Sequence, residues 1–486
     1  MTGSVIAIVG GGFCGVLSAV RLLEIGEGNL SKIILIEKQS RLGRGVAYGT
    51  SDESHLLNVP VGQMSAFSED PHHFLRFVGE TNPAVTANDF VSRKLYGRYI
   101  ESLLDTAVRS VGNVEFIRMM DCATDIQPLR DGRVEVVLAH GSTVIADKVI
   151  VATGNVAGRN PFAACRGNIA GNTHNNVAST FQANRYINNP WAAHALDNID
   201  LSQPVLLLGS GLTAIDMACS LVRYGFTKPI YMVSRHGLQA LAHATHHRDN
   251  TAPLPGKQLL NALLRARGGL RALRQQVERA AAEGHDWRDV LARLRPHIPA
   301  IWQRLSVAER QRFLRHLQRY WDMHRHRLPP HVAQLVEQLR AKGQLQQYAG
   351  RVAELAASND HFHVDIALRH SEATLTLRVG SIVNCTGICT NLERSDDPLL
   401  TNLRRRNLCT ADELKLGIEC DEHYALVNAH GVAANNIYYV GPYLRAKFWE
   451  ATAVPELREH VTSLVRQLVE QPQLARAPAI DLRIPA

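Results

Sequence analysis

The sequence lacks several features that would set it apart from ordinary globular proteins. No stretch of about 18 apolar residues is free of charge, so no membrane-spanning helix is indicated. The first apolar run begins at residue 5 without a basic leader or a small-residue cleavage site, which predicts a strand and not a signal peptide. Hydrophobic residues make up 45% and charged residues 20% of the chain, as is typical of a soluble globular protein.

Closely paired cysteines are also missing. The eight cysteines form no Cys-x-x-Cys pair, so neither a zinc site nor a redox dithiol is indicated, and reduced thiols in a cytoplasm are favoured. For Cys385 and Cys389, packing is favoured over a disulfide. The cluster of His243, His246 and His247 has a spacing compatible with a metal, but no acidic ligand pattern or zinc signature accompanies it, so no metal is expected.

Negative charge is in short supply, since the formal net charge is +8. This balance permits a polyanionic partner. Two phosphate-rich cofactors would account for it equally well, so neither nucleic acid nor a membrane is expected as a partner. With 486 residues the chain exceeds one ordinary core, and domains of about 100 to 200 residues give two to four of them.

The first pattern that carries chemistry lies at the N-terminus. An apolar strand precedes the spacing Gly10-x-Gly12-x-x-Gly15, and an apolar helical run follows it. Such glycines let the backbone approach a pyrophosphate, to which the helix N-terminus offers unpaired N–H groups. The next strand, Lys32–Ile36, ends at Glu37, 22 residues after Gly15, where an acid is expected to meet a ribose hydroxyl. This setting favours dinucleotide binding over an ordinary glycine-rich turn.

A second strand, turn and helix begins near residue 204. The turn has the form Gly209-x-Gly211-x-x-Ala214, in which the third small residue still allows close packing. The strand that follows ends in Ser234 and Arg235, 20 and 21 residues after Ala214. An arginine where an acid would otherwise stand favours a 2′-phosphate, so NADPH is expected in preference to NADH. The alternative is that Arg235 pairs with a carboxylate elsewhere.

Two apolar strands end in similar small residues, Ala152-Thr153-Gly154 and Asn384-Cys385-Thr386-Gly387. We expect each copy to close an excursion from the first nucleotide domain, so that strands at Ile382 and Ile437 complete that domain. The loop between Arg41 and Phe67 has neither helical nor strand period, and it is a candidate to line a cofactor or substrate, the alternative being a surface excursion.

These patterns predict an α/β protein with two Rossmann-like dinucleotide-binding domains and a helical insertion. The expected FAD-binding domain is discontinuous, over residues 1–165 and 380–486, and the inserted NAD(P)H-binding domain covers 190–258 and 341–379. The helical insertion, residues 259–340, includes the basic run His324–Arg327. That run could face a phosphate or an anionic substrate, or it could be a solvated charged face.

The chain resembles bacterial FAD- and NAD(P)-binding proteins of the two-dinucleotide flavoprotein superfamily, which includes flavin-containing and N-hydroxylating monooxygenases. The motifs that carry the resemblance are Gly10–Gly15 with Glu37, Leu57–Phe67, Arg93–Tyr99, Ala152–Gly154, Gly209–Ala214, Ser234–Gly237, Trp321–Arg327, Asn384–Gly387, and Gly441-Pro442 with Trp449–Leu457.

The resemblance implies FAD at the first glycine turn, with contacts through Glu37 and the Asn384–Gly387 region, and NAD(P)H at the second. It also implies cofactor contacts for Asn58, Thr153, Gly154, Thr386, Gly387 and Gly441. The flavin-containing monooxygenases carry a Phe-x-Gly-x-x-x-His-x-x-x-(Trp/Tyr) stretch, which Ile169–His174 matches neither in spacing nor in its aromatic residue. This departure puts oxygen transfer in doubt and leaves flavin and nicotinamide binding untouched.

The expected chemistry is carried by the flavin, so the protein has to position cofactors and substrate. No side-chain nucleophile is required, and neither Ser210, Cys14 nor any of the 22 histidines is interpreted as a covalent catalyst. The leading hypothesis is an NADPH-using, FAD-dependent monooxygenase that acts with O2 on a small molecule. A flavin reductase or dehydrogenase without oxygen insertion, and a non-enzymatic redox sensor that binds nucleotides, are the alternatives.

Overall fold

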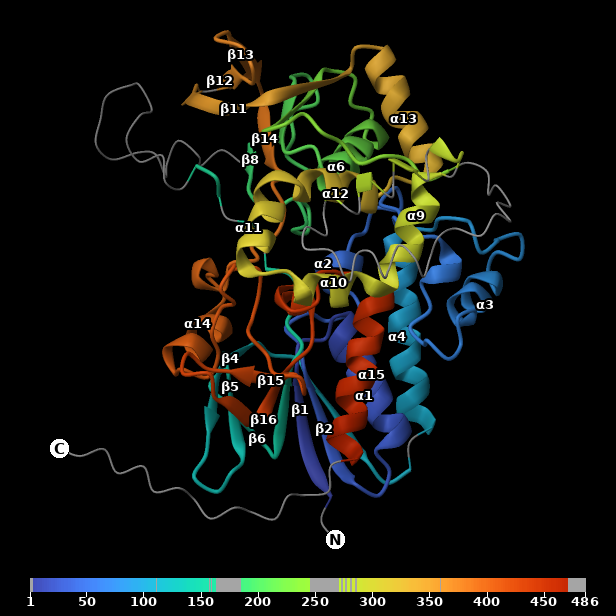
Figure 1. Cartoon of the computed structure of the whole chain (residues 1–486), viewed down its shortest axis with the longest axis vertical. Helices are drawn as coiled ribbons and strands as arrows, with labels where there is room; N and C mark the ends of the chain where they lie inside the picture. The colour runs from blue at the N-terminus through green and yellow to red at the C-terminus, as the bar shows by residue number, and fades with distance from the viewer. Residues whose placement is uncertain are drawn as a thin grey trace, which may run out of the picture.

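Two units stacked along the long axis make up the protein (Figure 1). The structure, a computed structural model, describes residues 3–110, 112–156, 158, 160–162, 185–244, 286–358 and 360–470, with positions 271, 274–275, 278–279 and 282–284. The lower unit in Figure 1 contains both the first and the last helix, and the upper unit is built from the middle of the chain. One unit is therefore inserted into the chain of the other, as the sequence predicted.

The first unit is built on a six-stranded sheet. In spatial order its strands are β15 (Ala425–Val427), β16 (Ala433–Tyr439), β7 (Lys148–Val151), β1 (Ser4–Val9), β2 (Leu30–Ile36) and β3 (Glu115–Met119). All neighbours are parallel except β15 and β16, and α1 (Phe13–Ile25) makes the crossover from β1 to β2. Ile437 pairs with Val149, so the late strand returns to the first sheet as predicted.

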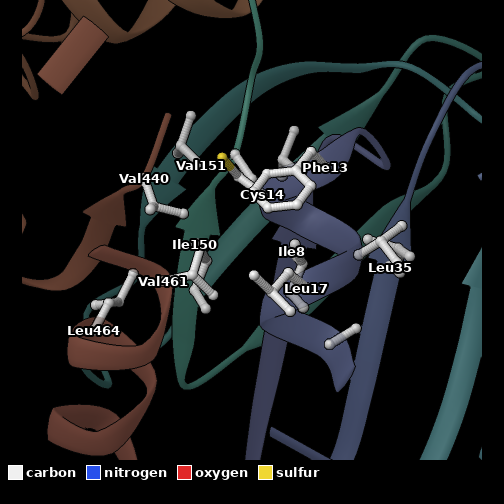
Figure 2. Close-up of a cluster of buried hydrophobic side chains, with 14 of the residues drawn as sticks. Ile8, Phe13, Cys14, Leu17, Leu35, Ile150, Val151, Val440, Val461 and Leu464 are labelled. Atoms are coloured by element: carbon white, nitrogen blue, oxygen red, sulfur yellow. The ribbon is translucent and has the colours of Figure 1, made fainter. Parts of the chain in front are cut away.

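The core of this unit lies between the sheet and a layer of three helices. Helix α1 packs against both α4 (Arg93–Ser110) and α15 (Val454–Glu470), so it is buried from Phe13 to Leu23. Figure 2 shows Leu17 of α1 near Ile8 of β1, with Val461 of α15 on the other side of the cluster. A helix enclosed on nearly all sides is mostly apolar around its circumference, which explains the largely apolar run after the first glycine turn, with Ser18 and Arg21 as its buried polar residues.

Smaller elements complete the first unit. They are α2 (Gly45–Tyr48), η1 (Val61–Gln63), α3 (His73–Gly79), the antiparallel strands β4 (Ala123–Pro128), β5 (Val134–Leu138) and β6 (Thr143–Ala146), η3 (Leu392–Arg394), α14 (Pro398–Arg405) and η4 (Pro442–Ala446). Helix α14 packs against β4, where the Asn402 amide donates to the Thr124 carbonyl oxygen over 2.8 Å.

The second unit is built on a seven-stranded sheet. In spatial order its strands are β13 (Thr374–Val379), β12 (Phe362–Leu368), β11 (Leu345–Ala357), β10 (Ile230–Ser234), β9 (Val205–Leu208), β14 (Ser381–Asn384) and β8 (Tyr186–Ile187). Helix α6 (Leu212–Arg223) follows β9, and α13 (Pro330–Ala341) leads into β11. The expectation that Ile382 returns to the first sheet is wrong, because Ile382 pairs with Leu206 of β9 and Tyr186 of β8.

Two segments that connect the units lie side by side. Val156, after β7, and Cys389, after β14, form an isolated antiparallel bridge in which the Cys389 amide donates to the Val156 carbonyl oxygen over 3.1 Å. A Cβ built on Gly158 would lie 2.1 Å from the Gly387 carbonyl oxygen, so the backbones are in close contact there. The chain thus leaves the first unit and returns to it at one place.

The segment predicted to be a helical insertion is helical in its described part, and it covers the junction between the units. Its described elements are α9 (Trp287–Leu294), η2 (Arg295–His297), α10 (Ile298–Arg304), α11 (Val307–His316) and α12 (Gln318–Arg325). Trp302 of α10 packs on Trp449 of the first unit with ring centroids 4.6 Å apart. Across the described ranges, no helix combines the length and apolarity needed to cross a lipid bilayer.

Candidate cofactor sites

The first glycine turn has the shape that a dinucleotide requires. Gly10 has a φ of +108°, and a Cβ there would lie 2.7 Å from the Ala152 carbonyl oxygen. A Cβ at Gly15 would lie 1.7 Å from the Gly10 carbonyl oxygen, so neither position accepts a side chain. Gly12 differs, because its nearest neighbour, at Gly45, is 3.8 Å away. The protein itself leaves open space at Gly12, where α1 begins and its N–H groups can meet a diphosphate.

Glu37 is fixed beside this turn. One carboxylate oxygen accepts a hydrogen bond from the Gly11 amide over 2.6 Å, and the other accepts one from the Gln39 amide over 2.9 Å. These two bonds hold the carboxylate at the end of β2, next to the strand that leads into the turn. The position is the one predicted for an acid that binds a ribose hydroxyl.

Three other predicted residues gather at the end of β7. Thr153 follows Ala152, and its carbonyl oxygen accepts a hydrogen bond from the Tyr439 hydroxyl over 3.1 Å. A Cβ on Gly441 would lie 3.0 Å from the same carbonyl oxygen. The Thr153 hydroxyl is buried without a hydrogen-bond partner among the described residues, and no atom lies within 4 Å of a Cβ built on Gly154. An unpaired hydroxyl beside open space fits a bound polar group such as FAD.

The second glycine turn repeats the first around a different strand end. Gly209 has a φ of +119°, and a Cβ there would lie 2.4 Å from the Cys385 carbonyl oxygen. Gly211 precedes α6 and has no neighbour within 4 Å of a built Cβ, whereas Ala214 is fully buried. Thr386 and Gly387 follow Cys385, so they lie at this second turn. Gly387 also lies against Gly158 in the segment that leaves the first unit, and the expectation that Thr386 and Gly387 contact the first nucleotide stays a prediction.

Ser234, the last residue of β10, and Arg235, which follows it, have different tasks. The Ser234 hydroxyl accepts a hydrogen bond from the Gly237 amide over 3.1 Å and donates one to the Ser210 hydroxyl over 2.8 Å, so it stabilises the loop that follows. Arg235 is exposed and makes no hydrogen bond or ion pair within the described part of the chain. Its guanidinium is available to a nucleotide phosphate.

The loop predicted to line a cofactor reaches the second unit. The imidazole Nε2 of His243 lies 2.9 Å from the Asn58 carbonyl oxygen and donates to it. Burial, reinforced by the charges of three nearby arginines, lowers the pKa of His243 to about 4, so the ring is neutral. His246 and His247, the other members of the histidine cluster, lie outside the described residues, as does the stretch Ile169–His174. Asn58 therefore lies where the two units meet.

The same loop also joins α6 through a buried polar network that the sequence analysis missed. The Ser220 hydroxyl donates to Asp52 over 2.6 Å and lies 2.7 Å from His55 Nε2, and these three side chains are at most 6% exposed. Burial acts to raise the pKa of Asp52, but hydrogen bonds from Ser220, Ser54 and Arg223 together lower it below its usual range. Burial lowers the pKa of His55, which is therefore neutral.

An ion pair also joins the two units. The Arg93 guanidinium of α4 lies 2.9 Å from the buried carboxylate of Asp216 in α6. Burial raises the pKa of Asp216, although the charge of Arg93 opposes that shift. A signal was present in the sequence, since Asp216, Ser220 and Arg223 recur at helical spacing in an otherwise apolar helix. Buried polar groups that satisfy one another across two units restrict how the units can be oriented.

Solved structures share this arrangement over nearly the whole chain. An ornithine N-hydroxylase from Kutzneria sp. 744 has a TM-score of 0.61 at 16% identity, over 97% of this chain and 99% of its own. L-lysine 6-monooxygenase from Pseudomonas syringae has a TM-score of 0.61 at 16% identity, over 96% and 99%. The cadaverine monooxygenase DfoA from Erwinia amylovora has a TM-score of 0.62 at 12% identity, over 100% and 99%. The chain has the two-dinucleotide-binding flavoprotein fold.

The first unit of this flavoprotein fold also matches a family model. Residues 7–156 match the family described as FAD-NAD(P)-binding, a stretch that includes the first glycine turn, Glu37 and Thr153. No curated protein sequence matches the chain. The predicted fold class and the predicted FAD/NAD(P)-binding domain are thereby confirmed.

Proposed function

We propose that the protein is an FAD-dependent monooxygenase that uses NADPH and O2 on a small-molecule substrate. The observation that carries this proposal is the presence of two complete glycine turns, at Gly10–Gly15 and Gly209–Ala214, in one two-dinucleotide-binding flavoprotein fold. The similar structures are hydroxylases or monooxygenases of ornithine, lysine and cadaverine by name, and this supports oxygen insertion into a small molecule.

The residues divide between two cofactors in this proposal. The first turn, with Glu37, Thr153 and Gly154, binds FAD, which supplies the redox chemistry when it is bound. The second turn binds NADPH, and Arg235 contacts its 2′-phosphate. Asn58, Gly441 and the segment with Thr386 and Gly387 line the space between the two nucleotides. The scattered cysteines support a cytoplasmic setting for this reaction.

The test follows electrons and oxygen separately. Purified protein should be yellow, and NADPH oxidation should accelerate when a substrate is added from a panel of amino acids, diamines and small carboxylic acids. Isotopically labelled O2 should place one labelled oxygen atom in the product. A colourless protein that cannot be reconstituted with FAD would overturn the proposal.

The same measurements separate the alternatives. Substrate-dependent NADPH oxidation without labelled product identifies a reductase or dehydrogenase. The departure of Ile169–His174 from the stretch found in flavin-containing monooxygenases supports this alternative. NADPH binding without steady-state oxidation identifies a redox sensor whose helical segment recruits a partner. The monooxygenase has the stronger support, because the structural neighbours named above insert oxygen.

A further inference from the structure

Four arginines meet beneath the helical segment, at the junction between the units. They are Arg288 of α9, Arg295 of η2, Arg325 at the end of α12, and Arg327 two residues beyond that helix. Burial and the charges of Arg325, Arg288 and Arg295 lower the pKa of Arg327 to about 10, although the charge of Asp286 opposes this shift. The sequence allows two interpretations of the basic run His324–Arg327, a solvated charged face and an anion site. In the structure, Arg327 of this run lies near three other arginines. We call these four side chains the arginine cluster.

Three members of the cluster have their own carboxylate. Arg288 pairs with Asp286 over 3.1 Å. Arg295 pairs with Glu456 in two hydrogen bonds, of 2.5 Å and 2.8 Å. Arg325 donates through Nε to Glu450 over 2.6 Å, and Glu450 is only 4% exposed.

Arg327 is the exception. It makes no hydrogen bond or ion pair with any described residue, and its Nε is buried without a partner. The neighbouring Arg325 Nη2 is also buried and unpaired within the described ranges. Two guanidinium groups therefore present unsatisfied N–H donors, and one positive charge is left over. A partly buried cation that lies near other cations is costly unless an anion compensates it.

A short segment places the cluster between the predicted cofactor sites. The Ser210 hydroxyl, in the second glycine turn, donates to the Leu238 carbonyl oxygen over 2.5 Å. Four residues later, the Ala242 carbonyl oxygen accepts two hydrogen bonds from Arg288, of 3.0 Å and 3.2 Å. Four residues span at most about 14 Å when fully extended. The next residue, His243, donates to Asn58 of the first unit.

We propose that Arg327 and Arg325 form the binding site for an anionic group, a carboxylate or a phosphate, of the substrate. The inference rests on the proposed function, which it deepens by naming a substrate class. A guanidinium presents N–H donors in a planar fork that matches both anions. Arg288 and Arg295 add positive potential but keep their own carboxylates. Trp287 lies beside Arg327, with its ring centroid 5.9 Å from the Arg327 Cζ.

The alternative source of the same chemistry is a phosphate of NADPH. The second glycine turn contacts the Leu238 end of the segment, whereas the arginine cluster contacts its Ala242 end. Arg235 is exposed beside that glycine turn. The free arginine of the cluster is therefore a second and separate anion site. The experiment keeps the two sources apart.

The test compares thermal unfolding of the FAD-loaded protein with glutarate or inorganic phosphate at constant ionic strength. Both probes should raise the Tm of the wild type. Arg327→Gln should weaken probe binding tenfold or more, while its Tm without a probe stays equal or rises, because the substitution removes repulsion and no intramolecular bond. Arg327→Lys keeps the charge without the fork and should fall between. Arg315→Gln, at an exposed arginine of α11, is the matched control and should bind like the wild type.

Three outcomes would overturn the inference. The Arg327→Gln protein could bind the probes as tightly as the wild type, it could lose stability without any probe, or it could lose affinity for NADP⁺ while small-anion binding stays intact. The last result would assign the cluster to the nicotinamide nucleotide. Since the Tm shift needs no turnover, the anion site can be confirmed even when no oxygen is inserted, and a failure of the proposed function remains distinguishable.

Discussion

The two glycine turns have the same backbone shape but are built from different residues. In the first, Gly15 packs so closely on Gly10 that a methyl group would overlap a carbonyl oxygen, whereas the second holds Ala214 at the same place. At the end of the next strand, the first turn has a carboxylate fixed by two amides, and the second has a serine that stabilises its own loop and an arginine that has no partner among the described residues. The two turns share a backbone shape and differ in the side chains after the next strand, so we expect the backbone to position a diphosphate and those side chains to select the nucleotide.

The largest effect is expected where the first turn is tightest. In Gly15→Ala the new Cβ would lie 1.7 Å from the Gly10 carbonyl oxygen, so the turn must open. We expect a loss of about 3 kcal/mol or more of the free energy of unfolding, together with loss of bound FAD. Urea unfolding and the flavin absorbance of the purified protein measure both effects.

The matched change in the second turn is Ala214→Gly. It should cost about 1 kcal/mol from helix propensity and leave both nucleotides bound. A third variant, Gly12→Ala, should fold with wild-type stability but bind FAD more weakly, since the open space there belongs to the ligand. Wild-type FAD content in Gly15→Ala would show that the steric account of the first turn is wrong.

A smaller effect on the free energy of unfolding is expected at low pH, from the protonation of His243 at the contact between the units. The pKa of His243 is lowered from 6.5 to about 4, so the unfolded chain takes up this proton first as the pH falls. The free energy of unfolding therefore keeps its full value above pH 6.5 and falls as the pH drops toward 4. The total loss from this one group is up to about 3 kcal/mol. His243→Gln keeps a donor toward Asn58 and should reduce the acid loss of stability, as urea unfolding at both pH values measures.

His430→Gln is the control for this titration. His430 is exposed and lies in the first unit, so its replacement should leave the pH dependence unchanged. An equal loss of stability in wild type and His243→Gln between pH 6.5 and pH 4 would show that His243 titrates normally.

The buried network that joins the two units is expected to give the next effect in size. Ser220→Ala removes the hydroxyl between Asp52 and His55 and leaves both with an unmet hydrogen bond. The free energy of unfolding should fall by about 2 kcal/mol, and NADPH should reduce the flavin more slowly because the units are less firmly oriented. Stopped-flow flavin absorbance measures the rate. Ser202→Ala, at an exposed serine of the same unit, should change neither quantity.

The smallest effect concerns nucleotide choice. Arg235→Ala should weaken NADPH binding about tenfold, equivalent to about 1.4 kcal/mol, and leave NADH binding nearly unchanged. The Kd of each nucleotide on the FAD-loaded protein measures the difference. Equal losses for the two nucleotides would mean that Arg235 does not contact the 2′-phosphate.

Local chemistry made much of this fold predictable from the sequence. Each glycine turn and its flanking strands lie within about 30 residues, as in any βαβ unit, so spacing alone identified them. The strand at Ile382 was misplaced because its small-residue end looks the same in either sheet, and only its pairing with Leu206 decides. The Ser220 network joins residues 165 positions apart, a distance that no local pattern spans.

The bridge between Val156 and Cys389 bears on how such a chain can arise in evolution. The excursion that forms the second unit starts and finishes at two neighbouring backbone positions, within one antiparallel residue pair. A host whose chain once ran directly between these points could accept the extra module without rearranging a strand of its own sheet. Gene duplication followed by insertion at a single surface point would then suffice to give one ancestral nucleotide binder two cofactors.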